Sequence, residues 1–408
     1  MADTLKPRDA KEVEEAVRWA LGDDKSLEIV GQGSKRRIGR PSQTDITLDL
    51  SGLSGVTLYE PDELVLSAKA GTPLAEIEAL LDKNSQQLAF EPMDYGPVLG
   101  LDADRGTIGG VIATNLSGPR RIKAGAARDH FLGVAAVTGR AESIKSGGRV
   151  VKNVTGYDLC KLIAGSWGTL AAMTDVTVKT LPKAETEATI VVLALDDAAA
   201  SKAMAAALSS FADVSGAAHL SAAVAGRIAQ SASAQTAVTA FRLEGVAPSV
   251  AQRKNLLENI LAPFGSLGAL GEADSLALWR AIRDVMPFAA DGSAGKRDVW
   301  RISTAPTQGA IVGAALAGTT GAELLYDWGG GLIWAAIPAT HDAHAPLVHA
   351  TVAANGGHAT LIRAPVAVRA SVDVFTPEPP VLAALTKRVR EGFDPQGVLN
   401  AGRMWAGV

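Results

Sequence analysis

The chain has 408 residues, of which 47% are hydrophobic and 20% are charged, and its formal net charge is −4 at pH 7. This length suits two or three domains with sizeable cores, and the weakly acidic balance gives no reason to expect a nucleic-acid partner. A single cysteine, Cys160, excludes an intrachain disulfide and a cysteine-ligated iron–sulfur cluster within the chain. The N-terminal residues lack the apolar core of a signal peptide and no run of 18 apolar residues occurs, so we expect a cytoplasmic protein without a transmembrane segment.

The N-terminal part alternates between predicted helices and strands. Apolar residues at helical spacing predict an amphipathic helix over 7–21. Short apolar runs predict strands over 27–30, 46–50 and 63–70. We expect Thr72 to cap a further helix that has Pro73 at its first position. This alternation is typical of an α/β or α+β fold.

The composition changes near Lys183. Before that point, strands are predicted over 132–138, 149–152 and 170–181. After it the chain is rich in alanine, and short strands are predicted over 189–195, 238–243 and 331–337. We expect these strands to form an antiparallel sheet, and the tail FDPQGVLNAGRM (393–404) to pack back on the first domain. The chain is therefore divided into domains at 1–183 and 184–370 and a C-terminal segment at 371–408.

Two glycine-rich segments interrupt the first domain. Loop one is GQGSKRR (31–37), and loop two is GTIGGVIATNLSG (106–118), which basic residues follow. Glycine allows backbone N–H groups to converge on an anion. A dinucleotide fingerprint is disfavoured, because Arg36 replaces its third glycine and Gly39 and Pro41 prevent a helix; no P-loop motif occurs. Two separate loops that share one diphosphate remain, with an ordinary strand turn as the alternative for loop one.

Further motifs accompany the two loops. They are Arg128-Asp129, Gly-Tyr-Asp-Leu at 156–159, Gly-Ser-Trp-Gly-Thr-Leu at 165–170 and the tail at 393–404. Together with loop two they resemble the vanillyl-alcohol-oxidase type of flavoprotein, and within it the FAD-binding subunits of bacterial glycolate oxidases. The resemblance covers residues 5–182 and the tail. It implies an α+β fold, with a PCMH-type FAD-binding domain of two α+β subdomains and a smaller antiparallel α+β cap domain.

The resemblance also implies how FAD is held. Both loops would cradle the diphosphate, the backbone of Val176 would contact the adenine or isoalloxazine side, and Asn400 would return toward the flavin, with an ordinary turn residue as the alternative for Asn400. The implied cofactor-binding residues are Gly31, Gln32, Gly33, Ser34, Lys35, Gly106, Thr107, Gly109, Gly110, Thr114, Asn115, Ser117, Gly118, Arg121, Val176 and Asn400. Some relatives attach FAD through a histidine in loop one, which this chain lacks, so we expect non-covalent FAD.

A substrate site is harder to find in the sequence. Oxidation of a 2-hydroxy acid needs a base for the hydroxyl proton and a cation for the carboxylate. The metal-binding His-x-Gly-Asp-Gly-Asn-x-His run of catalytic relatives is absent, so no metal is expected. His358 and Arg363, in the run GGHATLIR, are the candidate catalytic base and carboxylate clamp; a turn residue and a surface charge are the alternatives. We expect Trp328 to pack in the core or at the domain interface.

The resemblance implies the FAD-binding subunit of a multi-subunit glycolate oxidase, which oxidises glycolate to glyoxylate and passes electrons to a partner. A related larger FAD subunit and an iron–sulfur subunit would be its partners, and attachment to the inner face of the inner membrane through them stays open. The alternatives are a self-sufficient FAD-dependent dehydrogenase for D-lactate or another 2-hydroxy acid, and a flavin-free scaffold subunit.

Overall fold

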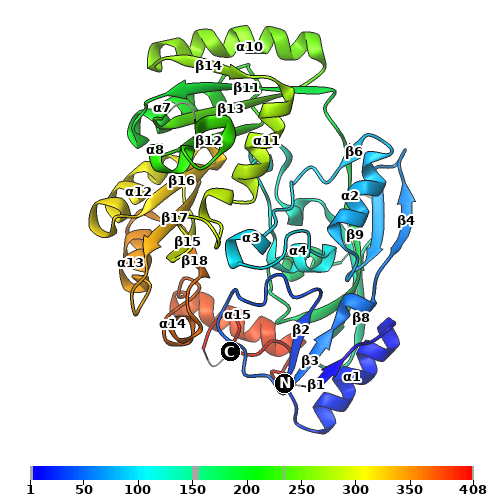
Figure 1. The fold of residues 1–408 in the computed structure, drawn as a ribbon. Coiled ribbons are helices and arrows are strands. Elements are labelled where there is room, and N and C mark those ends of the chain that lie inside the picture. The colour runs from blue at the N-terminus through cyan, green and yellow to red at the C-terminus, as the bar shows by residue number, and fades with distance from the viewer. Residues whose placement is uncertain (1–2, 149–155, 233–234, 407–408) are drawn as a thin grey trace.

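The computed structural model describes residues 3–148, 156–232 and 235–406. The strand predicted over 149–152 lies outside the described residues. Two larger sheets dominate the described chain, one in the N-terminal part and one in the part that follows Pro182 (Figure 1). None of the helices in the described ranges is long and apolar enough to cross a membrane.

The N-terminal part contains a parallel and an antiparallel sheet. The parallel sheet has the strand order β1-β3-β2, with β1 (Asp3–Leu5), β2 (Leu27–Val30) and β3 (Ile46–Asp49). The antiparallel sheet has the order β4-β5-β9-β7-β8, with β4 (Val56–Glu60), β5 (Val65–Lys69), β7 (Phe131–Thr138), β8 (Ser143–Gly147) and β9 (Ala171–Lys179). A separate short pair is formed by β6 (Gln86–Gln87) and β10 (Leu181–Pro182). The predicted strand over 170–181 therefore ends earlier, at Lys179.

In the described residues, six helices lie between these strands along the chain. They are α1 (Ala10–Gly22), α2 (Leu74–Asp82), α3 (Gly96–Leu99), α4 (Ile108–Thr114), α5 (Arg121–Ala124) and α6 (Leu159–Ile163). The Asp9 side chain caps α1 by accepting from the Glu12 backbone N–H. The predicted cap of α2 is wrong. Thr72 Oγ1 donates to the carbonyls of Lys69 and Gly55 instead, and α2 begins after Pro73 without a side-chain cap.

The part that follows Pro182 is built on an eight-stranded antiparallel sheet. Its order is β14-β11-β13-β12-β16-β17-β15-β18. The strands are β11 (Thr186–Leu193), β12 (Gly216–Leu220), β13 (Val238–Gly245), β14 (Leu267–Leu270), β15 (Arg297–Ser303), β16 (Glu323–Asp327), β17 (Leu332–Pro338) and β18 (His358–Arg363). Domain boundaries at 183 and 370 remain our proposal.

Several helices lie along the outer face of this sheet, on the side away from the N-terminal part, whereas the helix over Glu272–Arg283 lies on the inner side (Figure 1). The helices of this part are α7 (Asp197–Leu208), α8 (Ala222–Ala225), α9 (Ala229–Ala232), α10 (Ala247–Leu261), α11 (Glu272–Arg283), α12 (Pro306–Thr320), α13 (Ala345–Asn355) and α14 (Val366–Ser371). The 3₁₀ turns of the chain are η1 (Leu50–Gly52), η2 (Ala127–Asp129), η3 (Ala262–Phe264), η4 (Met286–Phe288) and η5 (Trp328–Gly330).

The two parts share one hydrophobic core. Ile108 and Val111 of α4 belong to the same buried cluster as Trp279 of α11 and Trp334 of β17. The tail then follows α15 (Pro380–Phe393) and returns to the N-terminal sheet, where Leu399 pairs with Leu27. This arrangement brings β2, loop two, the strands β15 and β18 and the tail into one neighbourhood.

Candidate active site

Loop one leaves β2 with free backbone donors. The consecutive N–H groups of Gly31 to Lys35 have no hydrogen-bond acceptor among the described residues. Gly33 has φ 76°, a left-handed conformation that glycine adopts without strain, and its carbonyl accepts from Arg36 N at 3.1 Å. Backbone donors in partly buried positions are normally paired. A row of free donors that lines a cavity is therefore a site for an anionic group.

Loop two packs directly against loop one. A Cβ on Gly31 would lie 2.6 Å from Thr107 Oγ1, so only glycine permits this approach. Thr107 caps α4 by accepting from Gly110 N at 3.2 Å, and Gly109 N donates to the Ala70 carbonyl at 2.8 Å. The expectation that loop two presents its glycine N–H groups to the ligand is wrong at these positions. Its glycines instead let the backbone pack closely.

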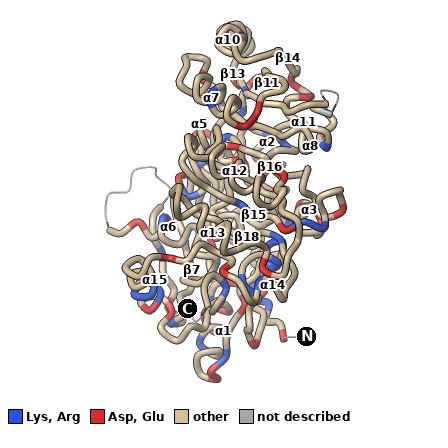
Figure 2. Tube along the Cα trace, turned by 90° about the vertical axis from the view of Figure 1, so that its left-hand side faces the viewer, with Lys and Arg blue, Asp and Glu red and all other residues tan. Residues whose placement is uncertain are grey.

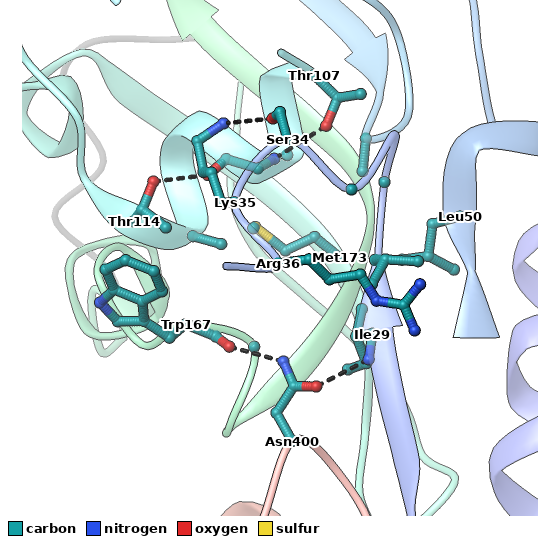
Figure 3. A pocket seen from close by; sticks show the side chains of 18 of the residues that line it. Ile29, Ser34, Lys35, Arg36, Leu50, Thr107, Thr114, Trp167, Met173 and Asn400 are labelled. Atoms are coloured by element: carbon teal, nitrogen blue, oxygen red, sulfur yellow. Dashed lines mark hydrogen bonds between the residues drawn. The ribbon is translucent and has the colours of Figure 1, made fainter. Parts of the chain in front are cut away.

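Lys35 adds a positive charge to the cavity between the loops. Its Nζ donates to Ser34 Oγ at 3.2 Å and has no ion-pair partner in the described part of the chain (Figure 3). Burial lowers the pKa of Lys35 to about 8, although Asp94 acts in the opposite direction. The side chain is therefore still protonated at neutral pH. A partly buried ammonium beside free N–H groups fits a diphosphate.

The tail braces this cavity. Asn400 Oδ1 accepts from Ile29 N and its Nδ2 donates to the Trp167 carbonyl, each at 2.8 Å (Figure 3). Arg403 donates to the carbonyl of Lys35 at 2.8 Å. Asn400 thus lines the cavity, but its amide is used to join the tail, β2 and the Trp167 loop. It positions loop one, whereas the sequence predicted contact with the flavin.

A second cavity of about 660 Å³ adjoins the first, since Thr114 and Trp167 line both. Its volume is typical of small-molecule sites. The N-terminal part contributes Tyr95, Asn115 and Arg121, and the part that follows Pro182 contributes Arg301, Trp328, His358 and Thr360. We call this the interface cavity. A ligand that extends from loop one past Thr114 enters it.

The interface cavity is rich in cations that lack a carboxylate partner. Neither Arg121 nor Arg301 forms an ion pair within the described residues, and the buried Nε of Arg301 has no hydrogen-bond partner there. Burial lowers the pKa of both guanidinium groups. His358 is exposed at the start of β18, and partial desolvation with the nearby charges of Arg301 and Arg121 lowers the pKa of its imidazole, which favours the neutral form. Two cations and a neutral base therefore meet in one cavity.

Most predicted cofactor residues lie around these cavities. The first cavity is lined by Gly31, Gln32, Gly33, Ser34, Lys35, Thr107, Gly109, Gly110, Thr114 and Asn400, and the interface cavity by Thr114, Asn115 and Arg121. The remaining predicted residues, Gly106, Ser117, Gly118 and Val176, line neither.

These four residues have structural roles instead. Val176 lies in the middle of β9, paired with Ala68 and Val134, so its backbone belongs to the interior of the sheet. Ser117 Oγ accepts from Ala127 N, and the Gly118 carbonyl accepts from the indole of Trp328. The Gly106 carbonyl accepts from Leu74 N.

The structure does not place Arg363 as a carboxylate clamp. Its guanidinium donates to the carbonyls of Val98, Phe288, Ala294 and Arg297, at 2.6 to 3.1 Å. It ties β18 to α3 and does not line the interface cavity. Arg301, which sequence reasoning missed, lines the interface cavity instead. A lone arginine in the apolar strand run Val299–Ile302 was the available signal. No cluster of metal-ligating side chains occurs in the described part of the chain.

Comparisons with known proteins agree with this geometry. Residues 2–147 match the family model described as FAD binding domain. Glycolate oxidase subunit GlcE of Escherichia coli K12 is 32% identical over 402 residues, 96% of each chain. A D-lactate dehydrogenase of Archaeoglobus fulgidus is 29% identical over 182 residues, 44% of this chain and 38% of the other. Crystalline p-cresol methylhydroxylase with substrate bound has a TM-score of 0.69 at 11% identity, covering 99% of this chain and 88% of the other.

Fold and site together define an FAD-dependent oxidoreductase with the α+β, PCMH-type fold, as the sequence predicted. Its cofactor is FAD. Within this class, the chain belongs to the family of glycolate oxidase subunit GlcE.

Proposed function

We propose that this chain is the FAD-binding subunit of a multi-subunit glycolate oxidase. It oxidises glycolate, or a close 2-hydroxy acid, at the CH–OH group and passes the electrons to a partner subunit. The observation that carries the proposal is the interface cavity, where Arg121, Arg301 and a neutral His358 line a space that adjoins the FAD cradle. Similarity along the whole chain to a protein named as a subunit supports the partner-dependent role.

Loop one would hold FAD through its diphosphate. The N–H groups of Gly31 to Lys35 and the ammonium of Lys35 are the donors suited to that group. The absence of a histidine from loop one supports non-covalent binding. When bound, FAD supplies an acceptor for the two electrons that leave the substrate carbon.

The chain's own residues would hold and activate the substrate. Arg301 and Arg121 are the groups to bind a carboxylate, because each has donors that no carboxylate of the described chain uses. His358 would accept the hydroxyl proton, since its lowered pKa keeps the imidazole neutral. The cavity shared by the two parts of the chain orients both ends of a short 2-hydroxy acid.

The partners remain part of the proposal. A related larger FAD subunit and an iron–sulfur subunit would receive the electrons, because a chain with one cysteine cannot ligate a cluster of its own. The complex would be cytoplasmic and would contact the inner membrane through these subunits.

The test compares the purified chain with the same chain co-expressed with candidate partners. We expect a yellow protein that releases FAD on denaturation, and glycolate-dependent reduction of a dye acceptor that rises strongly when the partners are present. A flavin-bearing chain that forms no complex would contradict the subunit role. Holoprotein that reduces no dye with glycolate or D-lactate in any assembly would contradict the reaction.

A self-sufficient 2-hydroxy-acid dehydrogenase is the second candidate. It is favoured by the fact that Arg121, Arg301 and His358 all come from this one chain. Full turnover by the isolated chain would decide for it. A flavin-free scaffold is disfavoured, because residues 2–147 match an FAD binding domain.

A further inference from the structure

Trp328 lies where the eight-stranded sheet meets the N-terminal part. It begins η5 directly after β16 and is 5% exposed. The guanidinium carbon of Arg121 is 4.2 Å from its ring centroid, and that of Arg301 is 5.1 Å away. Its indole Nε1 donates to the Gly118 carbonyl at 3.0 Å. One side chain therefore contacts two arginines from different parts of the chain and the end of loop two.

The backbone at Trp328 is held in an unfavourable conformation. Its φ is 55°, in the left-handed region that a bulky residue rarely adopts. The Asp327 carboxylate accepts from Trp328 N at 2.7 Å, and Gly329 and Gly330, also at positive φ, continue the turn. Such strain persists only where the surroundings determine the conformation, and it gathers at functional sites.

Arg121 and Arg301 carry like charges that repel each other, so another contact must keep them close together. Beyond the effect of burial, the charge of Arg301 lowers the pKa of Arg121, which shows that the two cations oppose each other. A carboxylate between them would remove the repulsion but would also occupy their donors. An aromatic face attracts guanidinium groups through its quadrupole and leaves their N–H groups free. A buried tryptophan is thus suited to hold unpaired arginines for an anionic ligand.

We propose that Trp328 is a positioning residue that holds Arg121 and Arg301 together to grip the carboxylate of the substrate. This inference rests on the proposed function, since it assigns the binding end of the same cavity. The indole N–H bond to Gly118 fixes the ring against loop two, so the arginine pair is positioned relative to the FAD cradle.

The test uses holoprotein and oxalate, a dicarboxylate that cannot be oxidised as a 2-hydroxy acid. Calorimetry measures oxalate binding to wild type, W328F and W328L, and steady-state assays measure KM and kcat for glycolate. We expect W328L to bind oxalate about tenfold more weakly and to raise KM, with kcat changed less. W328F keeps an aromatic face and should restore most of the affinity. W328M is used if W328L does not retain FAD.

Trp279 provides the matched control. It is also buried, its indole donates to Thr189 Oγ1 at 2.8 Å, and Arg242 lies 4.7 Å from its ring, but it lines no part of the interface cavity. W279L should leave oxalate binding unchanged.

Equal oxalate affinity in wild type and W328L would overturn the inference, as would an equal loss in W328L and W279L or no binding by wild type. Wild-type protein that binds oxalate but oxidises no 2-hydroxy acid would contradict the proposed function alone. The comparison with W328L would still decide the role of Trp328.

Discussion

The interface between the two parts of the chain has two sides, which differ in whether their arginines form ion pairs. Arg120 and Arg121 are adjacent in sequence, yet Arg120 lies 3.0 Å from Glu91 and 2.7 Å from Glu244, whereas Arg121 forms no ion pair among the described residues, although Asp129 also lines the interface cavity. On the Arg120 side the charges are neutralised by the protein itself. On the Arg121 side we propose that a ligand neutralises them.

This difference has a thermodynamic meaning. An unpaired buried charge is costly, while a buried pair is costly to break. Residues of both charges occur in both parts of the chain (Figure 2). Unpaired cations occur at the interface cavity and at Lys35, the two places where the proposed ligands carry negative charge; Arg121 is exposed there, and Arg301 and Lys35 are partly buried.

On the side where arginines form ion pairs, a substitution of Arg242 removes one such pair. Arg242 is 1% exposed and donates to both oxygens of Glu91 at 2.9 Å. We expect R242M to reduce the free energy of unfolding by about 3–5 kcal/mol, because Glu91 loses a partner while it stays buried. Denaturant unfolding of the holoprotein measures this. R301M, which breaks no ion pair in the described chain, is the control and should change stability little. Similar losses in both variants would contradict the distinction between the two sides.

The ion pairs that Glu91 forms with Arg120 and Arg242 should stop stabilising the fold at acidic pH. Burial opposes ionisation of Glu91, but Arg242 and Arg120 outweigh it and lower the pKa of Glu91 from its ordinary 4.5 to about 2. A lowered folded-state pKa stabilises the fold above the ordinary value, and this stabilisation is lost as the pH falls from 4.5 toward 2. Denaturant unfolding at a series of pH values measures the loss. In R242M the loss of stability over this range should be smaller.

The side with arginines that form no ion pair is tested by measuring glycolate oxidation. We expect R301M to reduce kcat/KM for glycolate by about 10- to 100-fold, because a charge-assisted bond to the carboxylate is lost. FAD content should not change, since Arg301 does not line the cavity between the loops. R363M is the informative comparison, because Arg363 serves backbone carbonyls and its loss should lower stability. Unchanged kinetics in R301M would remove Arg301 from the site.

The two regions also differ in what the sequence could reveal. The proposed FAD cradle is local: glycines at fixed spacing after a strand indicate a turn with exposed backbone donors, and Gly31 to Lys35 line the first cavity. The interface cavity is assembled from α5, β15 and β18, and no spacing along the chain predicts that Arg121 and Arg301 meet.

Errors within the predicted site have the same origin. Arg363 follows the strand run that suggested it, but carbonyls from distant segments capture its guanidinium. Strand pairing likewise places Val176 in the interior of a sheet. These outcomes depend on tertiary contacts, whereas the alternation of helices and strands in the first domain depends on local pattern and was predicted well.

The packing role of loop two can be separated from ligand binding by two alanine substitutions. A Cβ at Gly109 would lie 2.7 Å from the Ala70 carbonyl oxygen, a backbone atom that cannot give way. At Gly110 the nearest atom, Thr107 Oγ1, would be 3.1 Å away. We expect G109A to cost about 1–3 kcal/mol of stability and to lose FAD, and G110A to cost less. The fraction of FAD retained after gel filtration and the unfolding midpoint measure both. A smaller loss of stability in G109A than in G110A would show that loop two is not tightly packed at Gly109.

The smallest expected effect is that of Lys35 on FAD affinity. Lys35 is, like Arg121 and Arg301, a cation without an ion-pair partner in the described chain, but it lies in the proposed FAD cradle. The pKa of Lys35 in the protein without ligand is about 8, and a bound diphosphate would raise it by favouring the ammonium. FAD binding then takes up a proton, so affinity should fall by about tenfold between about pH 7 and pH 9 as the free side chain loses its charge. K35R stays charged and should bind FAD with little pH dependence, and K35M should bind weakly at every pH. If the FAD affinities of wild type and K35M change in parallel with pH, the titrating group is not Lys35 and the ammonium does not face the diphosphate.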